Sequence, residues 1–231
     1  MADAAAITVK GVSKTYGRGP SAVRVLRDIH LEIASGEFVA ILGPSGSGKS
    51  TLLNLLGLMD RPDTGELIVR GRRAADLGEL ERAKLRCAHI GFVFQFDSLL
   101  PEFTIAENIL MPARLAVVNG LSGEPLAESS IRATALLESL GIGALRDRFP
   151  AQTSGGERQR AAIARALINK PSVILADEPT GNLDRANGDR VFADFRRVAR
   201  EQGAAVVLVT HDEPAAKAAD RFLRMTDGRL A

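Results

Sequence analysis

The chain has 231 residues, 45% hydrophobic and 25% charged, and its 30 basic and 28 acidic side chains give a formal net charge of +2. This length suits one large domain with a substantial core, and the near-neutral charge gives no support for a dedicated nucleic-acid surface. The single cysteine, Cys87, excludes an internal disulfide and fits a reducing cytoplasm. Because the N-terminus lacks a basic region followed by a long apolar one, and no eighteen apolar residues run together, we expect a chain that neither enters nor crosses a membrane.

Two segments near the N-terminus, residues 7–12 and 28–33, alternate apolar and polar side chains. This alternation predicts two strands of an antiparallel sheet with one solvent-exposed face. Between them lies Tyr16, the only Tyr in a chain without Trp. Its ring can stack on an adenine, but a packing role in a turn is the alternative, and the residue alone does not decide between them.

A phosphate-binding loop is predicted at residues 43–50, Gly-Pro-Ser-Gly-Ser-Gly-Lys-Ser. It follows a short apolar run typical of a buried strand (38–42) and precedes a leucine-rich helix (51–56), so backbone N–H groups and the helix N-terminus converge on one anion. Lys49 is expected to reach the β- and γ-phosphates, and the Ser50 hydroxyl to bind Mg²⁺. The alternative is a flexible Gly/Ser loop without a ligand. The residues assigned to this site are Gly43, Pro44, Ser45, Gly46, Ser47, Gly48, Lys49, Ser50 and Thr51.

Residues 61–95 are predicted to end in a buried strand with a polar residue at its carboxyl end. A turn at 61–65 precedes a short strand (66–70), residues 72–88 are charged and partly helical, and residues 89–95 form a buried strand that ends in Gln95. Ligands of open α/β sheets gather at such carboxyl ends. Gln95 can therefore reach a phosphate or a metal-bound water, or it is an ordinary surface residue.

Residues 97–150 contain no strand pattern and predict a mainly helical insertion. Thr104 is a candidate N-cap for one helix, and residues 126–140 form another. An apolar cluster lies between Gln95 and the first inserted helix, and it is either core or a docking surface. Its members are Phe96, Leu99, Leu100 and Phe103.

A second candidate anion site opens the alanine-rich helix that follows. Ser154, Gly155 and Gly156 precede Glu157, and small residues at a helix N-terminus leave its positive dipole end accessible. An ordinary Ser cap with a flexible approach explains the same residues equally well.

Two carboxylates end the apolar strand 173–178. Asp177 and Glu178 are neighbours in a strand, so they are expected to point to opposite sides, one holding Mg²⁺ and the other activating water. A helix is predicted over residues 187–201, and residues 205–210 form what we expect to be the last strand, ending at His211. A lone His is more often structural than catalytic.

Taken in chain order, these segments resemble the nucleotide-binding subunit of an ATP-binding cassette (ABC) transporter, and the match covers nearly the whole chain. The resemblance implies ATP and Mg²⁺ as ligands, Lys49, Gln95, Glu178 and His211 as catalytic groups, and Ser50, Gln95 and Asp177 around the metal. By position, the family's elements are the adenine-stacking Tyr16, Walker A at 43–50, the Q-loop Gln95, the signature motif Ser154, Gly155, Gly156 and Glu157, the Walker B pair Asp177 and Glu178, the D-loop Asp184, and the switch His211.

The resemblance also implies a fold and an assembly. The fold is the α/β P-loop fold of ABC ATPases, with a mostly parallel core sheet, an N-terminal antiparallel β-subdomain and a helical insertion. We expect one domain over residues 1–231, with a RecA-like core at about 1–96 and 151–231 and a helical subdomain at about 97–150. In this family two copies pack head to tail, so that the signature helix of one covers the phosphates bound by Walker A of the other.

Within the family, residues 90–95, Leu99-Leu100-Pro101 and Glu107-Asn108 are similar to lipoprotein-releasing and macrolide-exporter ATPases, and closest to the lipoprotein-releasing members. Such proteins drive a transmembrane permease from the cytoplasmic face of a bacterial inner membrane, and some systems include a periplasmic adaptor. We expect the permease to dock near residues 96–103. Asp97 and Ser98 replace a usual His pair, which leaves the cargo open. Thr153 replaces a usual Leu, a change that we expect to alter helix packing more than phosphate binding.

Other members of the wider class remain as alternatives. Cell-division ATPases work by mechanotransmission rather than export, and the sequence does not separate the two. DNA-maintenance ATPases insert a long heptad segment, which residues 97–150 lack, and translation factors carry two cassettes where this chain has one Walker A.

Overall fold

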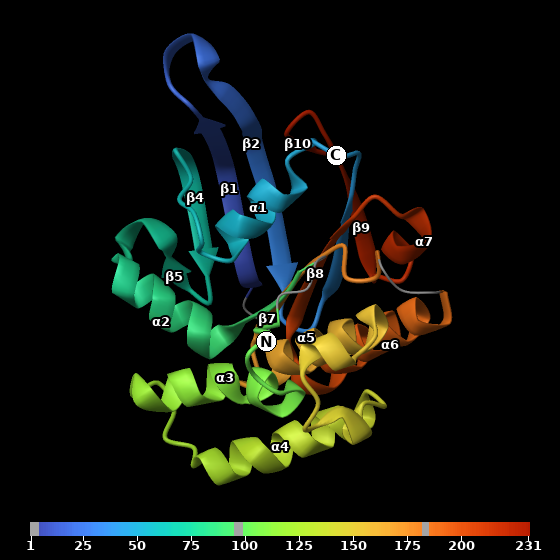
Figure 1. Cartoon of the computed structure of the whole chain (residues 1–231). Helices are drawn as coiled ribbons and strands as arrows, with labels where there is room; N and C mark the ends of the chain where they lie inside the picture. Colours follow the sequence, from blue (N-terminus) through green and yellow to red (C-terminus); the bar gives the residue numbers. More distant parts are fainter. Residues whose placement is uncertain (1–4, 95–98, 182–184) are drawn as a thin grey trace.

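The computed structural model describes residues 5–94, 99–181 and 185–231, and it contains two sheets and a group of helices (Figure 1). The smaller sheet has the order β2-β1-β4-β5 and is antiparallel. Its strands are β1 Ala5–Tyr16, β2 Val23–Ala34, β4 Thr64–Val69 and β5 Arg72–Arg73. The predicted N-terminal antiparallel sheet is therefore confirmed. β1 is longer than expected, because Tyr16 still pairs with Val23 across the hairpin, and this places Tyr16 on a strand end rather than in a loop.

The larger sheet has the order β10-β9-β3-β8-β7-β6. Its inner pairs are parallel, and only β10 runs antiparallel to its neighbour. The strands are β3 Phe38–Leu42, β6 Ile90–Val93, β7 Val173–Asp177, β8 Ala205–Thr210, β9 Arg221–Thr226 and β10 Arg229–Leu230. The expectation that β8 is the last strand was wrong. Leu223 and Met225 alternate with polar residues before an Asp-Gly turn, a signal for a strand and hairpin at the sheet edge.

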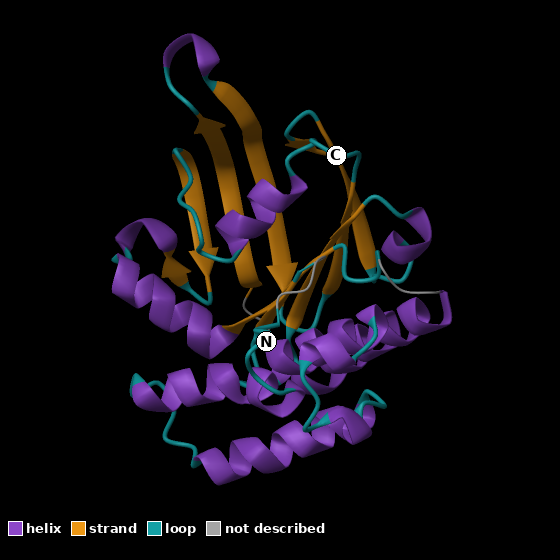
Figure 2. Cartoon of the chain, in the orientation of Figure 1, coloured by secondary structure: helices purple, strands orange, loops and turns teal. Residues whose placement is uncertain are grey.

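Helices pack on both faces of the large sheet (Figure 2). They are α1 Lys49–Leu56, α2 Glu79–His89, α3 Ile105–Val118, α4 Leu126–Ser139, α5 Gly155–Leu167, α6 Arg185–Gln202 and α7 Glu213–Ala216. Within the described part of residues 97–150 there is no strand, so the predicted helical character of this segment is confirmed. Its division from the rest as a separate subdomain stays a prediction.

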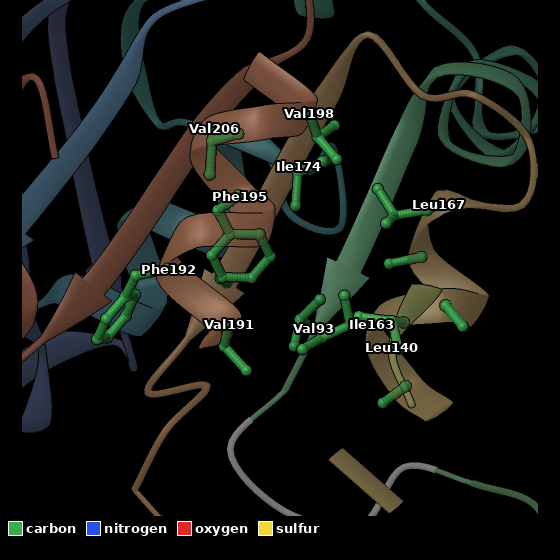
Figure 3. Close-up of a cluster of buried hydrophobic side chains, with 14 of the residues drawn as sticks. Val93, Leu140, Ile163, Leu167, Ile174, Val191, Phe192, Phe195, Val198 and Val206 are labelled. Atoms are coloured by element: carbon green, nitrogen blue, oxygen red, sulfur yellow. The ribbon is translucent and has the colours of Figure 1, made fainter. Parts of the chain in front are cut away.

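The central sheet is buried on both faces, as expected for parallel strands between two layers. Along β3, Phe38 and Ala40 belong to a core with α3 to α7, while Val39 and Ile41 belong to a second core with α1 and the antiparallel sheet. In the first core, Phe195 of α6 packs edge-on against Phe38, with ring centroids 6.2 Å apart. Figure 3 shows residues of β6, β7, β8, α5 and α6 that meet there.

Parallel pairing brings the ends of the central strands to one edge of the sheet. Leu42 of β3 pairs with Thr210 of β8, and Asp177 of β7 pairs with Val209 of β8. The segments that follow these three strands, residues 43–50, Glu178 and His211, therefore leave the sheet at the same edge.

Candidate functional site

The loop between β3 and α1 wraps around its own lysine. Lys49 Nζ donates hydrogen bonds to the carbonyls of Gly43 at 2.7 Å and Pro44 at 3.0 Å, and the side chain is buried. Gly48 caps the helix with φ of 106°, a backbone conformation that glycine adopts without strain. At Gly43 a Cβ would lie 2.3 Å from the Met225 carbonyl of β9, so only glycine fits this close approach. The loop is thus held in a compact form that a side chain at either position would disrupt.

The hydroxyl of Ser47 in this loop is unsatisfied: Oγ is buried and has no hydrogen-bond partner among the described residues. The backbone of Ser47 is fixed, since its N–H donates to the Pro44 carbonyl at 3.2 Å and its carbonyl accepts from Gly228 N–H at 3.0 Å. An orphaned hydroxyl in a loop of this shape is consistent with a site completed by an anionic ligand.

Asp177 ends β7 next to the phosphate loop. Burial raises the pKa of this carboxyl and the charge of Glu178 raises it further, while a hydrogen bond with the Ser50 side chain and the charge of Lys49 act in the opposite direction. Carboxylate and hydroxyl oxygens are hard donors that suit Mg²⁺, which binds one or two protein groups together with phosphate oxygens and water. No group of three or more His, Cys, Asp or Glu suited to a metal occurs in the described residues, and a Mg²⁺–phosphate site does not require one.

Glu178 points to a different partner from Asp177, but not because of strand alternation. β7 ends at Asp177, and Glu178 has φ of 46°, in the left-handed region that is unfavourable for side chains other than glycine. Two hydrogen bonds hold it there: its N–H donates to Val209 O at 3.0 Å, and its carbonyl accepts from Gly181 N–H at 3.1 Å. The two carboxylates are separated by this backbone turn, so the prediction of one continuous strand over residues 173–178 was wrong at its last residue.

The Glu178 carboxylate contacts the start of the segment after β8. Oε1 lies 2.6 Å from His211 Nδ1 and accepts from the His211 N–H at 3.1 Å, and Oε2 accepts from the Thr210 hydroxyl at 3.4 Å. The Glu178 side chain is mostly buried and that of His211 is mostly exposed. This pairing orients the imidazole and leaves Nε2 for a second partner.

Tyr16 lies at the end of β1, and the residue is 41% exposed. Its hydroxyl donates to Asp60 Oδ2 at 2.8 Å, and Lys14 Nζ lies 5.1 Å from the ring centroid. Burial and then the hydrogen bond to the Asp60 carboxylate raise the pKa of Tyr16. The ring is therefore a neutral, partly exposed surface near Thr51, whose side chain also forms a hydrogen bond with Tyr16.

The signature segment forms a capping box at the start of α5. Ser154 Oγ accepts from Glu157 N–H at 3.4 Å, while Glu157 Oε2 accepts from the Ser154 N–H at 2.7 Å and its hydroxyl at 2.8 Å. These bonds to its own backbone and hydroxyl lower the pKa of Glu157. Ser154 is exposed, and its described hydrogen bonds all lie within its own helix. These contacts agree equally well with an ordinary Ser cap and with an anion-binding site at the N-terminus of α5.

Thr153, which precedes this cap, is buried and donates its hydroxyl to the Pro150 carbonyl at 2.9 Å. Its own carbonyl accepts from Arg158 Nη1 at 2.6 Å. The hydroxyl is thus satisfied within the loop before α5, where a leucine has no donor to offer.

Several predicted site residues fall outside the described part of the chain. These are Gln95, Asp184 and, in the expected docking segment, Phe96, Asp97 and Ser98. Just before Gln95, the Phe94 carbonyl accepts from Gln159 Nε2 of α5 at 3.2 Å, which ties the helix of the signature segment to the end of β6. Gln159 and Asp60 were not singled out from the sequence, because nothing in the local pattern distinguishes them from other polar residues.

Comparison with known proteins identifies the family. A family model described as ABC transporter matches residues 26–181. This chain belongs to that family. Accordingly it is an ATP-binding protein and an ATPase. Among curated proteins, it is 47% identical to the "Lipoprotein-releasing system ATP-binding protein LolD" of Bordetella pertussis, over 97% of this chain and 95% of that protein. It is 46% identical to the protein named LolD 2 of Caulobacter vibrioides, over 97% of this chain and 96% of that protein.

Among solved structures, the chain is similar to a dimeric ATP-binding cassette in a post-hydrolysis state bound to ADP and Pi. The TM-score is 0.88 and the identity 39%, over 97% of this chain and 96% of that one. A bacterial ABC transporter cassette, also dimeric, matches with a TM-score of 0.88 and 40% identity over the same shares. The predicted fold class is thereby confirmed.

Proposed function

We propose that the chain is the ATP-hydrolysing subunit of a lipoprotein-releasing transporter and works at the cytoplasmic face of the inner membrane. One observation carries the chemical part: the lysine loop, the Ser50–Asp177 pair and the Glu178–His211 pair all occupy one edge of the central sheet. The names of the relatives support lipoprotein release as the work that ATP powers. No described helix is both long and apolar enough to cross a membrane.

The proposed chemistry uses groups that the structure already orients. Lys49 exchanges a loop carbonyl for the phosphate oxygens of ATP, and the backbone N–H groups of the loop bind the same anion. Glu178 accepts a proton from the attacking water, with His211 fixing the direction of its carboxylate. Mg²⁺, held by Ser50 and Asp177, would neutralise the charge that develops on the transferred phosphoryl group.

The signature segment supplies the remaining part of the site from a second copy. Ser154, Gly155 and Gly156 open α5 with exposed or half-buried groups, and their described hydrogen bonds reach no residue of the phosphate loop. A head-to-tail pair of chains places this helix end on the phosphates bound by the other copy, with ATP between them. The dimeric state of the similar cassettes supports this arrangement.

A groove between α2 and α3 is the proposed docking site for the permease. Its floor and walls are mainly apolar, and several members are exposed: Met59 by 46%, Leu100 by 41% and Leu115 by 49%. Leu100 belongs to the segment 96–103 that the sequence pointed to. A permease loop with apolar side chains fits this surface, so Leu115→Asp should reduce co-purification of the permease and leave ATP binding by the isolated chain unchanged.

The variant Glu178→Gln tests the enzymatic proposal. Removing the base should lower steady-state ATP hydrolysis by about 10²–10⁴-fold while ATP still binds and draws two chains into a stable dimer. Sedimentation velocity with and without ATP measures the dimer, and phosphate release measures turnover. Glu66→Gln is the matched control, since the half-buried Glu66 forms an ion pair with Arg73 on the antiparallel sheet. Normal turnover in Glu178→Gln would overturn the proposal.

A further inference from the structure

The turn that follows α1, residues 58–61, is held by two arginines of α2. Arg82 Nη2 donates to the Leu58 carbonyl at 2.6 Å and also to the Asp60 carbonyl, and Arg86 Nη1 donates to the Leu58 carbonyl at 2.7 Å. Leu58 has φ of 56° and is fully buried, and the Arg82 side chain is only 2% exposed. A buried cation on the carbonyls of Leu58 and Asp60 restrains this turn and with it the backbone that carries the Asp60 side chain.

The Asp60 carboxylate joins this turn to the end of β1. Oδ1 accepts from Lys14 Nζ at 2.7 Å and from the Arg61 N–H at 2.6 Å, and Oδ2 accepts from the Tyr16 hydroxyl at 2.8 Å. Lys14 Nζ donates in addition to the Arg61 carbonyl at 2.7 Å. Burial raises the pKa of Asp60, but the hydrogen bonds from Lys14, Tyr16 and the Arg61 N–H outweigh burial and leave the pKa below its usual value. The carboxylate is therefore charged at neutral pH and engaged on both oxygens.

These contacts restrain the Tyr16 ring from two directions. The hydroxyl is fixed by Asp60, and the ammonium group of Lys14 lies over the ring, 5.1 Å from its centroid. The residue as a whole nevertheless remains 41% exposed. An aromatic side chain fixed in this way has already lost its rotamer freedom before a flat ligand arrives, and a preorganised surface binds more tightly than a mobile one.

We propose that Asp60 is a positioning residue for nucleotide binding, which holds Tyr16, with Lys14 behind it, as a preformed platform for the purine base of ATP. The proposal rests on the proposed function, because it takes the base to stack on Tyr16. Asp60 acts on affinity for the base alone: it touches neither the phosphate loop nor Glu178 in the described contacts. Asp60 lies 44 residues after Tyr16 in the chain. Its contact with the Tyr16 hydroxyl gives the acidic side chain of this turn a role in nucleotide binding.

Inorganic tripolyphosphate separates base binding from phosphate binding. It contains the triphosphate of ATP without a base, so a change confined to the platform weakens ATP and leaves tripolyphosphate unaffected. Loss of one side-chain hydrogen bond that holds the platform corresponds to about a three- to tenfold rise in the dissociation constant of ATP for Asp60→Ala. Asp60→Asn retains an acceptor for Lys14 and a polar contact for the tyrosine hydroxyl, and it should restore most of the affinity.

The test is calorimetric titration of the full-length chain and its variants with ATP and with tripolyphosphate, together with KM and kcat for ATP hydrolysis. We expect Asp60→Ala to raise the dissociation constant and KM for ATP, to keep kcat and tripolyphosphate affinity, and to have no added effect in a Tyr16→Ala background. Glu124→Ala is the control for general loss of stability, since Glu124 bridges Arg132 and Lys170 elsewhere. It should lower the melting temperature and leave both dissociation constants unchanged.

Tyr16→Phe supports the same test if Asp60→Ala fails to fold. It keeps the ring and removes the hydroxyl that Asp60 accepts from, so about a threefold weaker ATP affinity is expected. Wild-type affinity in Tyr16→Phe, or an Asp60→Ala effect that is equal for ATP and tripolyphosphate, would overturn the positioning role. Failure of Tyr16→Ala to alter ATP affinity would overturn it as well. None of these results touches the proposed function, which depends on Lys49 and Glu178.

Discussion

Asn108 offers the sharpest test of how the docking segment is built. This residue of α3 is fully buried, and its side chain organises the turn just before the helix. Nδ2 donates to the carbonyls of Leu100, Phe103 and Thr104, each at 3.0 Å, and Oδ1 accepts from the Leu100 N–H at 2.7 Å. Asn108→Ala removes all four contacts and leaves a cavity at a fully buried position beside the backbone groups that they satisfied.

The cost follows from how many of those groups keep another partner. The carbonyls of Leu100 and Thr104 also accept from the N–H groups of Phe103 and Asn108, whereas the contacts to Phe103 O and Leu100 N–H are lost. With about 1 kcal/mol for each ordinary hydrogen bond and more for a buried group left unsatisfied, the free energy of unfolding should fall by about 2–4 kcal/mol. For a chain of this size the melting temperature should fall by about 5–15 °C.

Urea denaturation followed by circular dichroism measures this change. Asn119→Ala is the matched control: Asn119 ends the same helix and is exposed, with one side-chain bond to the Leu115 carbonyl, so its loss should cost under about 0.5 kcal/mol. Because Leu100 lines the proposed docking groove, Asn108→Ala should also weaken permease binding while ATP affinity stays normal. A change in unfolding free energy of less than about 0.5 kcal/mol for Asn108→Ala would refute the reasoning.

Two further predictions concern packing and pH. In Gly91→Ala the new Cβ of β6 would lie 2.4 Å from the Ala166 carbonyl of α5, so the variant should lose about 1–3 kcal/mol of unfolding free energy in urea, whereas Gly123→Ala, with open space around it, should behave as wild type. The hydrogen bond from Arg132 lowers the pKa of Glu124 to about 2 from 4.5. A lowered folded-state pKa gives stability that is present above pH 4.5 and lost as the pH falls towards 2. The stability advantage of the wild type over Glu124→Gln should therefore disappear across that interval in thermal melts; an advantage that persists at pH 2 would contradict this.

The phosphate loop was predictable because its signal is local. A buried strand, a glycine-rich turn and a helix follow one another within residues 38–56, and the structure arranges them in that order as β3, the loop and α1. Asp177 and His211 were placed at strand ends for the same reason, and parallel pairing of β7 and β8 then sets them at one edge. The functional roles of these residues stay predictions.

Contacts between distant segments were not predictable from the pattern. The left-handed backbone of Glu178 depends on hydrogen bonds to Val209 and Gly181, so strand periodicity gave the wrong reason for its orientation. Likewise, Asp60 meets Tyr16 only because α2 fixes the turn after α1 against the end of β1. β9 was not predicted because it is an alternating segment and not a continuous apolar run like β3 and β8; the Asp-Gly turn that follows it was the available signal.

The claim that each ATP site is shared by two copies is tested most directly by complementation. All chains carry Glu178→Gln so that bound ATP is retained; one also carries Lys49→Ala and the other Ser154→Arg. Neither variant alone should trap ATP in a dimer, since every site would lack either its lysine or its helix end. In the mixed dimer one site lacks both and the other is intact, so mixing should restore about one trapped ATP per mixed dimer. Full ATP trapping by the Ser154→Arg chain alone would contradict a shared site.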